Sequence, residues 1–158
     1  MLDPGRNSPG DRGVAIAIEH VGSTSVPGLA AKPVIDMNIV VRRDDVPKAT
    51  EILATLRYVH VGNQGIADRE AFKYSFNKPA HHLYVTPDDS AELQRQILFR
   101  DYLRANPEVA QQYGELKQKL AKQYHDDRVA YTDAKTEFIV GVMQKALTDK
   151  ERQISSYL

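Results

Sequence analysis

The chain of 158 residues contains no cysteine, which excludes disulfides and zinc sites with cysteine ligands. It has no apolar run close to the roughly 20 residues that a membrane-spanning helix needs. The N-terminal residues include Asp3 and Asp11 and lack the apolar core of a signal peptide. We therefore expect a soluble, cytoplasmic protein that has no membrane partner.

The chain also lacks an excess of charge of either sign, because 21 Lys and Arg residues match 21 Asp and Glu residues. A net charge of zero does not give the electrostatic footprint of a protein that coats DNA or RNA. We therefore expect no nucleic-acid partner. Hydrophobic residues make up 42% of the chain, which is enough for a single core.

Residues 1–13 are rich in Gly, Pro, Asn and Asp. Gly5 and Gly10 have the spacing of a phosphate-binding loop, but Asp11 stands where that loop has lysine. Such a segment buries too little apolar surface to offset its ordering entropy, so we predict a mobile leader.

The length of the chain predicts one domain, which we place at residues 14–150. Within it we expect a sheet core at 14–88 and a helical part at 89–150. Residues 151–158 are expected to form a tail.

Two predicted strands flank the turn with the most informative residues. Residues 14–21 alternate in polarity, and residues 34–41 are nearly all apolar. The turn Gly22-Ser23-Thr24 between them lets the backbone approach a ligand closely and offers N–H and hydroxyl donors. An ordinary Gly-Ser turn is the alternative interpretation.

Asp36 and Asn38 interrupt the second strand and point to one face, since they are two residues apart. An unpaired charge inside a sheet costs on the order of several kcal/mol. Asp36 therefore needs a cation, a metal ion or donors from the turn; the structural alternative is an Asp satisfied by Lys32 or by backbone amides. We favour a functional role for Asp36 and leave both roles of Asn38 open.

Periodicity predicts four further elements before residue 88, a helix and three strands, over 44–57, 58–61, 72–76 and 81–85. Asp44 or Asp45 is expected to cap the helix. The loop at 62–69 carries two glycines and ends at Arg69.

His82 and Tyr84 in the last strand point away from Leu83 and Val85. If these two apolar residues pack into the core, His82 and Tyr84 lie on the face of the sheet that carries Asp36. The alternative for His82 is a polar residue that is hydrogen-bonded at a sheet edge.

Three helices are predicted from residue 89 onward, over 90–105, 106–125 and 132–148. Lys135 would follow a cap at Thr132 or Asp133, on a first turn where a cation is unfavourable unless an anion lies nearby. An exposed lysine is the alternative. Three lysines of the middle helix are expected to form a solvated face: Lys117, Lys119 and Lys122.

A Gly-Ser turn followed, after residues 24–35, by a strand with Asp36 resembles the active-site layout of the nucleotidyltransferase superfamily. The stretch Glu19-His-Val-Gly-Ser-Thr-Ser-Val-Pro-Gly-Leu-Ala-Ala-Lys-Pro-Val-Ile-Asp36 resembles the signature of the GrpB family within it. Three later blocks resemble the same family: His81-His-Leu-Tyr-Val85, Phe99-Arg-Asp-Tyr-Leu-Arg-Ala-Asn-Pro107 and Tyr131-Thr-Asp-Ala-Lys-Thr-Glu-Phe-Ile139.

The resemblance implies an α/β (α+β) fold, with a nucleotidyltransferase-like mixed sheet, helices packed on it and a C-terminal helical extension. It implies a metal site for Mg²⁺ or Mn²⁺ at Asp36 and Asn38, with His82 as a further ligand or a general base. It also implies contacts to the phosphates or the rest of the substrate from Gly22, Ser23, Thr24, Lys32, Arg69, Tyr84 and Lys135.

Two departures from the family pattern bear on this interpretation. The superfamily places carboxylates where this chain has Asn38 and His82, and both are poorer Mg²⁺ ligands. Family members usually begin with an aromatic-rich helix, whereas this chain has no tryptophan and a Gly/Pro-rich leader. We therefore expect the outer face of the first strand to lack its cover.

Two functions remain open at this point. The first is an enzyme that transfers a nucleotidyl group from a nucleoside triphosphate to an acceptor. The second is a non-catalytic accessory domain that binds a nucleotide, a CoA-like metabolite or a partner protein. Metal-dependent nucleotide binding that requires Asp36 would favour the first.

Overall fold

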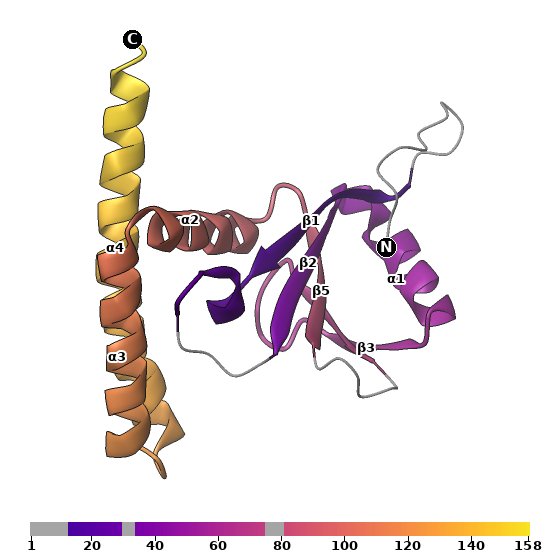
Figure 1. Cartoon of the computed structure of the whole chain (residues 1–158). Coiled ribbons are helices and arrows are strands. Elements are labelled where there is room, and N and C mark those ends of the chain that lie inside the picture. The colour runs from indigo at the N-terminus through magenta and orange to yellow at the C-terminus, as the bar shows by residue number, and fades with distance from the viewer. Residues whose placement is uncertain (1–12, 30–33, 75–80) are drawn as a thin grey trace. The chain divides into compact units, whose positions relative to one another are not determined.

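A computed structural model describes residues 13–29, 34–74 and 81–158. These residues form an α+β fold with a five-stranded sheet and four α-helices, so the predicted fold class is confirmed (Figure 1). Most of the predicted leader lies outside the described residues.

The contacts divide the chain into two compact units. The sheet unit comprises the described residues of Met1–His20 and Met37–Leu93, and the helical unit those of Val21–Asp36 and Gln94–Leu158. The turn after the first strand therefore belongs with the helices. The predicted domain limits stay a prediction.

The strands follow the order β1-β2-β5-β4-β3 in the sheet, and β4 pairs antiparallel with both β3 and β5. Their bounds agree with the predicted strands to within a few residues: β1 Ala15–Val21, β2 Ile35–Val41, β3 Tyr58–Gly62, β4 Glu70–Tyr74 and β5 His81–Pro87. Two apolar residues of β1, Ile16 and Ile18, are exposed. Whether a segment covers this strand stays a prediction.

Helix α1, Val46–Thr55, packs on the sheet through Ala49 and Leu53. Its partners in the core are apolar residues of three strands: Val41, Phe72, Leu83 and Val85. The helix follows a 3₁₀ turn, Arg43–Asp45, and its N-cap Asp45 makes no side-chain capping hydrogen bond.

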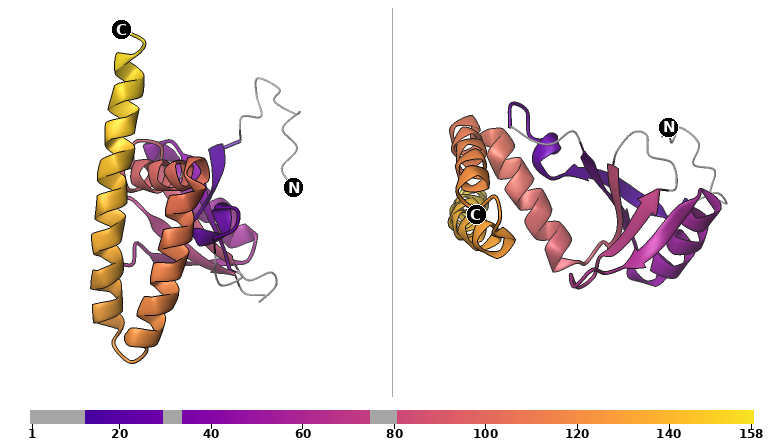
Figure 2. Two further views of the ribbon diagram at one scale, coloured as in Figure 1. Left: turned by 60° about the vertical axis from the view of Figure 1, so that its left-hand side comes forward. Right: turned by 90° about the horizontal axis from the view of Figure 1, so that it is seen from below.

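The helical unit is built on three helices: α2 Ala91–Ala105, α3 Pro107–Gln123 and α4 Arg128–Ser155. Helices α3 and α4 run side by side as a hairpin (Figure 2). The N–H of Leu93 donates to the Ser90 Oγ at 3.2 Å, so of the two residues whose type suits a cap here, Asp89 and Ser90, it is Ser90 that caps α2. No helix among the described residues is long and apolar enough to cross a membrane.

The prediction for the last helix is wrong at both ends. The Asp127 carboxylate accepts a hydrogen bond from the Ala130 N–H at 3.0 Å, so the helix is capped there and begins at Arg128. The Thr132 hydroxyl caps nothing, because it donates back to the Arg128 carbonyl at 2.8 Å. Lys135 is therefore two turns inside α4, and the argument that placed it on a first turn does not hold.

Candidate functional site

The turn after β1 depends on glycine at position 22. Gly22 has φ 76°, a conformation that side chains with a Cβ rarely adopt. A Cβ there would meet the Asp36 carboxylate, with 3.2 Å to Cγ and a closer approach to Oδ2. The structure thus brings together two of the predicted residues, with the Asp36 carboxylate packed against the Gly22 backbone.

The turn continues as a short 3₁₀ segment, Ser23–Ser25, which holds the half-buried Thr24. The Ser25 hydroxyl and N–H both donate to the Gly22 carbonyl, at 2.5 Å and 3.1 Å. Arg104 Nε of α2 donates to the Ser25 carbonyl at 2.8 Å. The buried Val26 joins the core of the helical unit, so side-chain and backbone contacts both fix the turn.

Lys117 of α3 reaches this turn. Its Nζ donates to the Ser23 Oγ at 2.7 Å and lies 4.9 Å from the centre of the Tyr113 ring. Tyr113 is buried and stacks on Phe138, with 5.6 Å between ring centres. The aromatic core of the helical unit therefore supports the ammonium group beside Ser23.

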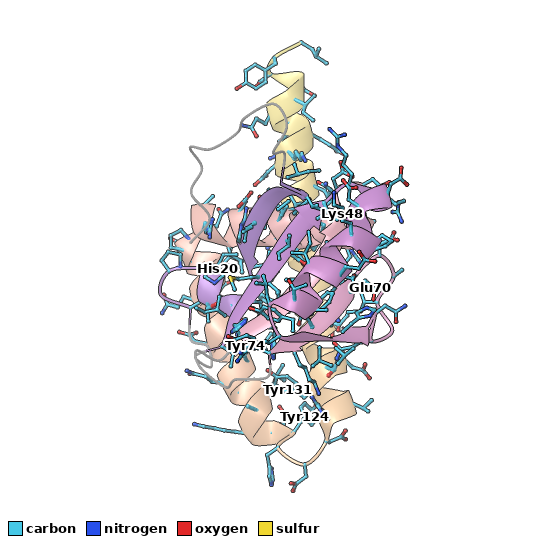
Figure 3. All side chains as sticks on the ribbon, turned by 90° about the vertical axis from the view of Figure 1, so that its right-hand side faces the viewer. His20, Lys48, Glu70, Tyr74, Tyr124 and Tyr131 are labelled. Carbon is cyan, nitrogen blue, oxygen red and sulfur yellow. The ribbon has the colours of Figure 1, made fainter. Side chains whose placement is uncertain are left out.

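A second lysine, Lys135 of α4, lies close enough to act on Lys117. Burial first, and then repulsion from Lys135, lower the pKa of the Lys117 ammonium below its usual value. Lys135 lies 5.3 Å from the centre of the Tyr131 ring, which Figure 3 shows near the α3–α4 end of the unit. We call the group formed by Gly22, Ser23, Asp36, Lys117 and Lys135 the turn cluster.

The sequence prediction missed Lys117, which it assigned to a solvated face. The helical spacing of the sequence does indicate that Lys117 lies on the buried face of its helix. Lys117 follows Tyr113 by four residues and precedes Leu120 by three, and both of these are buried. Residues at these spacings share a helix face, so Lys117 belongs to the core-facing side of α3.

The remaining predicted residues lie in the sheet unit, apart from Lys32, which is outside the described residues. Asn38 is buried, and its Oδ1 accepts a hydrogen bond from the Thr86 hydroxyl at 2.6 Å. Thr86 shares its face of β5 with His82 and Tyr84 through strand alternation. Asn38 thus has a structural role in the sheet, and its role as a metal ligand stays a prediction.

Arg69 and Tyr84 contact each other on this face of the sheet unit. The Arg69 guanidinium lies 4.4 Å from the centre of the Tyr84 ring, a cation–π geometry. The Arg69 Nε is buried without a hydrogen-bond partner. The exposed His82 ring lies 6.3 Å from the Tyr84 ring.

An ion-pair network fixes the loop that ends at Arg69. Arg43 Nη1 donates to Asp68 Oδ1 at 2.8 Å, and its Nη2 donates to Asp89 Oδ1 at 2.7 Å. These hydrogen bonds from Arg43 hold the pKa of each carboxyl below its usual range. Glu70 (Figure 3), the first residue of β4, accepts a hydrogen bond from His60 at 2.7 Å.

The site offers few side chains that could coordinate a metal ion. Among the residues that the structure describes, no group of three or more His, Asp and Glu side chains could hold an ion. The turn cluster offers one carboxylate, that of Asp36. We therefore derive no reaction step through Mg²⁺ or Mn²⁺, and the metal stays a prediction.

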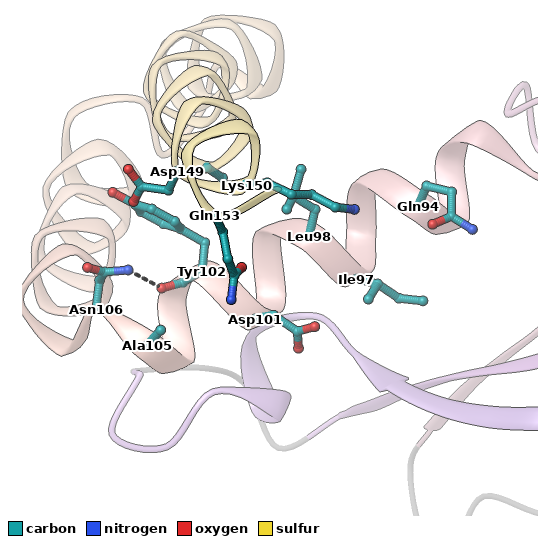
Figure 4. A pocket seen from close by; sticks show the side chains of 11 residues that line it. Gln94, Ile97, Leu98, Asp101, Tyr102, Ala105, Asn106, Asp149, Lys150 and Gln153 are labelled. Carbon is teal, nitrogen blue, oxygen red and sulfur yellow. Dashed lines mark hydrogen bonds between the residues drawn. The ribbon is translucent and has the colours of Figure 1, made fainter. Parts of the chain in front are cut away.

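A separate hollow of about 330 Å³ lies between α2 and α4 (Figure 4). Its apolar lining includes Ile97, Leu98 and Tyr102, whose carbonyl accepts a hydrogen bond from Asn106 Nδ2 at 2.8 Å. None of the residues predicted from the sequence lines it. The turn cluster is therefore the better candidate for the functional site.

Comparison with known proteins gives relatives of one kind. The chain is 43% identical over 125 residues to the UPF0157 protein YqkA of Bacillus subtilis (strain 168), a match that covers 78% of this chain and 36% of the relative. It is 37% identical over 137 residues to the UPF0157 protein PA4798 of Pseudomonas aeruginosa, covering 84% of this chain and 56% of the relative. The chain thus spans less than two thirds of each relative's length.

A solved structure and a family model agree with these matches. The crystal structure of conserved protein GrpB from Enterococcus faecalis is similar with a TM-score of 0.72 and 34% identity, over 87% of this chain and 83% of that one. The model of the GrpB protein family matches residues 10–145. The four sequence blocks, the fold and these matches together show that this chain belongs to the GrpB family.

Proposed function

We propose that the helical unit binds a phosphate group of a nucleotide or a related metabolite at the turn cluster. The observation that carries the proposal is the hydrogen bond of 2.7 Å from Lys117 Nζ to Ser23 Oγ, at a turn that only glycine accommodates, with Lys135 close to Lys117. Backbone N–H groups, a hydroxyl and two ammonium groups are the donors that recognise phosphate oxygens.

The electrostatics support an anionic ligand. Lys117 is half-buried, and its pKa is lowered by burial and by Lys135. A bound phosphate would replace this repulsion by attraction and would favour the charged form of both lysines. Part of the cost of placing two cations together would thus be offset when the ligand binds.

The test is thermal unfolding of the chain with inorganic phosphate, pyrophosphate and ATP, each in EDTA and in MgCl₂. A ligand that binds the folded state at about 100 times its Kd stabilises it by about 2.7 kcal/mol. We expect ATP to raise the Tm of the wild type and to leave that of Lys117→Met nearly unchanged. Methionine keeps the contact with Tyr113 and removes the charge.

Lys119→Met is the matched control, because Lys119 is an exposed residue on the same helix. It should keep the full response to ATP. An equal response in Lys117→Met and the wild type would rule out binding at the turn cluster, and so would the absence of any response to all three phosphates.

Nucleotidyl transfer is a second candidate, favoured by the packing of the Asp36 carboxylate against Gly22. In this reaction an acceptor oxygen attacks the α-phosphorus of a nucleoside triphosphate, and pyrophosphate leaves. Release of pyrophosphate with Mg²⁺ or Mn²⁺ present, and its loss in Asp36→Ala, would support transfer. Nucleotide binding that needs neither the metal nor Asp36 would favour the accessory domain.

A further inference from the structure

The sheet unit contains a buried hydrogen-bond donor that lacks an acceptor. The Arg69 Nε is enclosed by the protein, and no partner for it is found among the residues that the structure describes. The Nη2 of the same guanidinium donates to the Gln64 Oε1 at 3.5 Å, which is long for such a bond. A buried donor without an acceptor lowers the stability of a fold, and such donors are rare in native proteins. This one therefore calls for an explanation, and a ligand that brings the acceptor supplies it.

The Tyr84 ring fixes the position of this guanidinium. The Arg69 Cζ lies over the ring, 4.4 Å from its centre. The neighbours of Tyr84 in β5, Leu83 and Val85, pack in the core with α1, so strand alternation places Tyr84 on the other face of the sheet. The exposed His82 shares that face. The ring attracts the cation but offers no oxygen acceptor to its N–H groups.

The loop before Arg69 is held in a strained conformation. Gln64 and Asp68 have φ values of 53° and 57°, in the left-handed region that residues other than glycine seldom adopt. The ion pair between Asp68 and Arg43 holds the end of this loop. Backbone strain of this kind persists only where the surrounding structure imposes it, and it is concentrated at binding sites. The fold thus holds Arg69 in one position before any ligand arrives.

Charge and shape indicate the ligand. Arg43 is paired with two carboxylates, Asp68 and Asp89, so it does not add to the positive charge of Arg69. A single guanidinium matches an anion with one negative charge better than a phosphate dianion. Its Nε–H and one Nη–H lie side by side in a plane, at a spacing that suits the two oxygens of a carboxylate.

We propose that the sheet unit binds the carboxylate of a small organic acid at Arg69, on the face of the sheet that carries His82 and Tyr84. The carboxylate accepts two parallel hydrogen bonds, one from Nε and one from Nη2. Gln64 is exposed, so its amide can leave Nη2 and open this edge of the guanidinium. Arg69 belongs to the sheet unit and the turn cluster to the helical unit, so the inference does not rest on the proposed phosphate binding.

NMR spectra of the isotope-labelled full chain test binding at the unpaired donor itself. The resonance of the Arg69 Nε–H is identified by its loss in Arg69→Lys. Acetate and succinate are titrated at constant ionic strength, with sodium chloride as the balancing salt. We expect the Arg69 Nε–H resonance of the wild type to shift and to reach saturation, because this group gains an acceptor.

The backbone amide resonance of Tyr84 reports binding in the variants. Arg69→Lys keeps the positive charge and loses the planar pair of donors, so it should bind the acids at least about tenfold more weakly. Arg42→Lys is the matched control, because Arg42 is an exposed arginine of the same unit. It should bind as the wild type does.

Two results would overturn the proposal. The first is an Arg69 Nε–H resonance that stays in place with both acids or that moves equally with sodium chloride alone. The second is unchanged affinity in Arg69→Lys. A separate titration with sodium phosphate tests the choice of ligand: saturation at a lower concentration than with either acid would overturn the assignment of a carboxylate.

Discussion

The two units of this chain use charged side chains in different ways. In the sheet unit, Arg43 is neutralised by two carboxylates, Asp68 and Asp89, and the three groups fix a loop. In the helical unit, Lys117 and Lys135 lie close enough to repel each other, and Lys117 is half-buried. The contacts between opposite charges serve the fold, whereas two lysines that repel each other, one of them bonded to Ser23 of the glycine turn, fit the anion binding that we propose.

The largest effect should follow a change at the turn of the helical unit. We expect Gly22→Ala to lower the free energy of unfolding by about 3 kcal/mol, because alanine adds both a positive-φ strain and a clash with Asp36. Urea denaturation measures the loss. Gly28 is the matched control, since it also has a positive φ of 78° but, among the residues that the structure describes, no atom within 4 Å of an added Cβ.

Gly28→Ala should therefore lower the free energy of unfolding only through the strain of a positive φ, by about 1 kcal/mol. Equal losses in the two variants would show that the contact between Gly22 and Asp36 contributes nothing.

An intermediate effect is expected in the sheet unit at Asn38. Asn38→Ala leaves the buried Thr86 hydroxyl without its acceptor, which should cost about 2 kcal/mol. Thr86→Val in the Asn38→Ala background should cost little more, since the hydroxyl that lost its partner is then gone. Denaturant unfolding of the two single variants and the double variant measures this coupling. If the losses in free energy of unfolding of the two single variants simply add up in the double variant, the hydrogen bond to Thr86 is not the reason that position 38 carries a polar side chain.

The smallest effect is expected for Arg43→Gln, because its ion pairs are exposed. Arg43 lowers the pKa values of Asp68 and Asp89 in the folded state. Their stabilising contribution is therefore present above the pKa of an unfolded Asp and is lost as the pH falls through the lowered folded values. Unfolding curves of the wild type and Arg43→Gln should converge toward acid pH. If the difference in the free energy of unfolding between the wild type and Arg43→Gln stays constant down to acid pH, Arg43 stabilises the fold through packing and not through its ion pairs.

Local patterns predicted the elements well where the pattern was regular. The strands at 34–41 and 81–85 and the helix that starts after Ser90 are found, since apolar alternation and a cap are local signals. The start of α4 was misassigned because Asp127 and Thr132 are both acceptable caps by type. Only the observed hydrogen bonds distinguish the residue that caps from the one that bonds back into the helix.

The sequence by itself determined the family and the fold class, and it predicted Gly22, Ser23 and Asp36 as site residues, because these depend on residue types at short spacing. The tertiary structure decided which side chains gather at that turn. Lys117 comes from a helix 94 residues further along the chain, and Asn38 is engaged with Thr86, 48 residues away. Such contacts depend on how α3 packs and how strands pair, which local residue patterns do not encode.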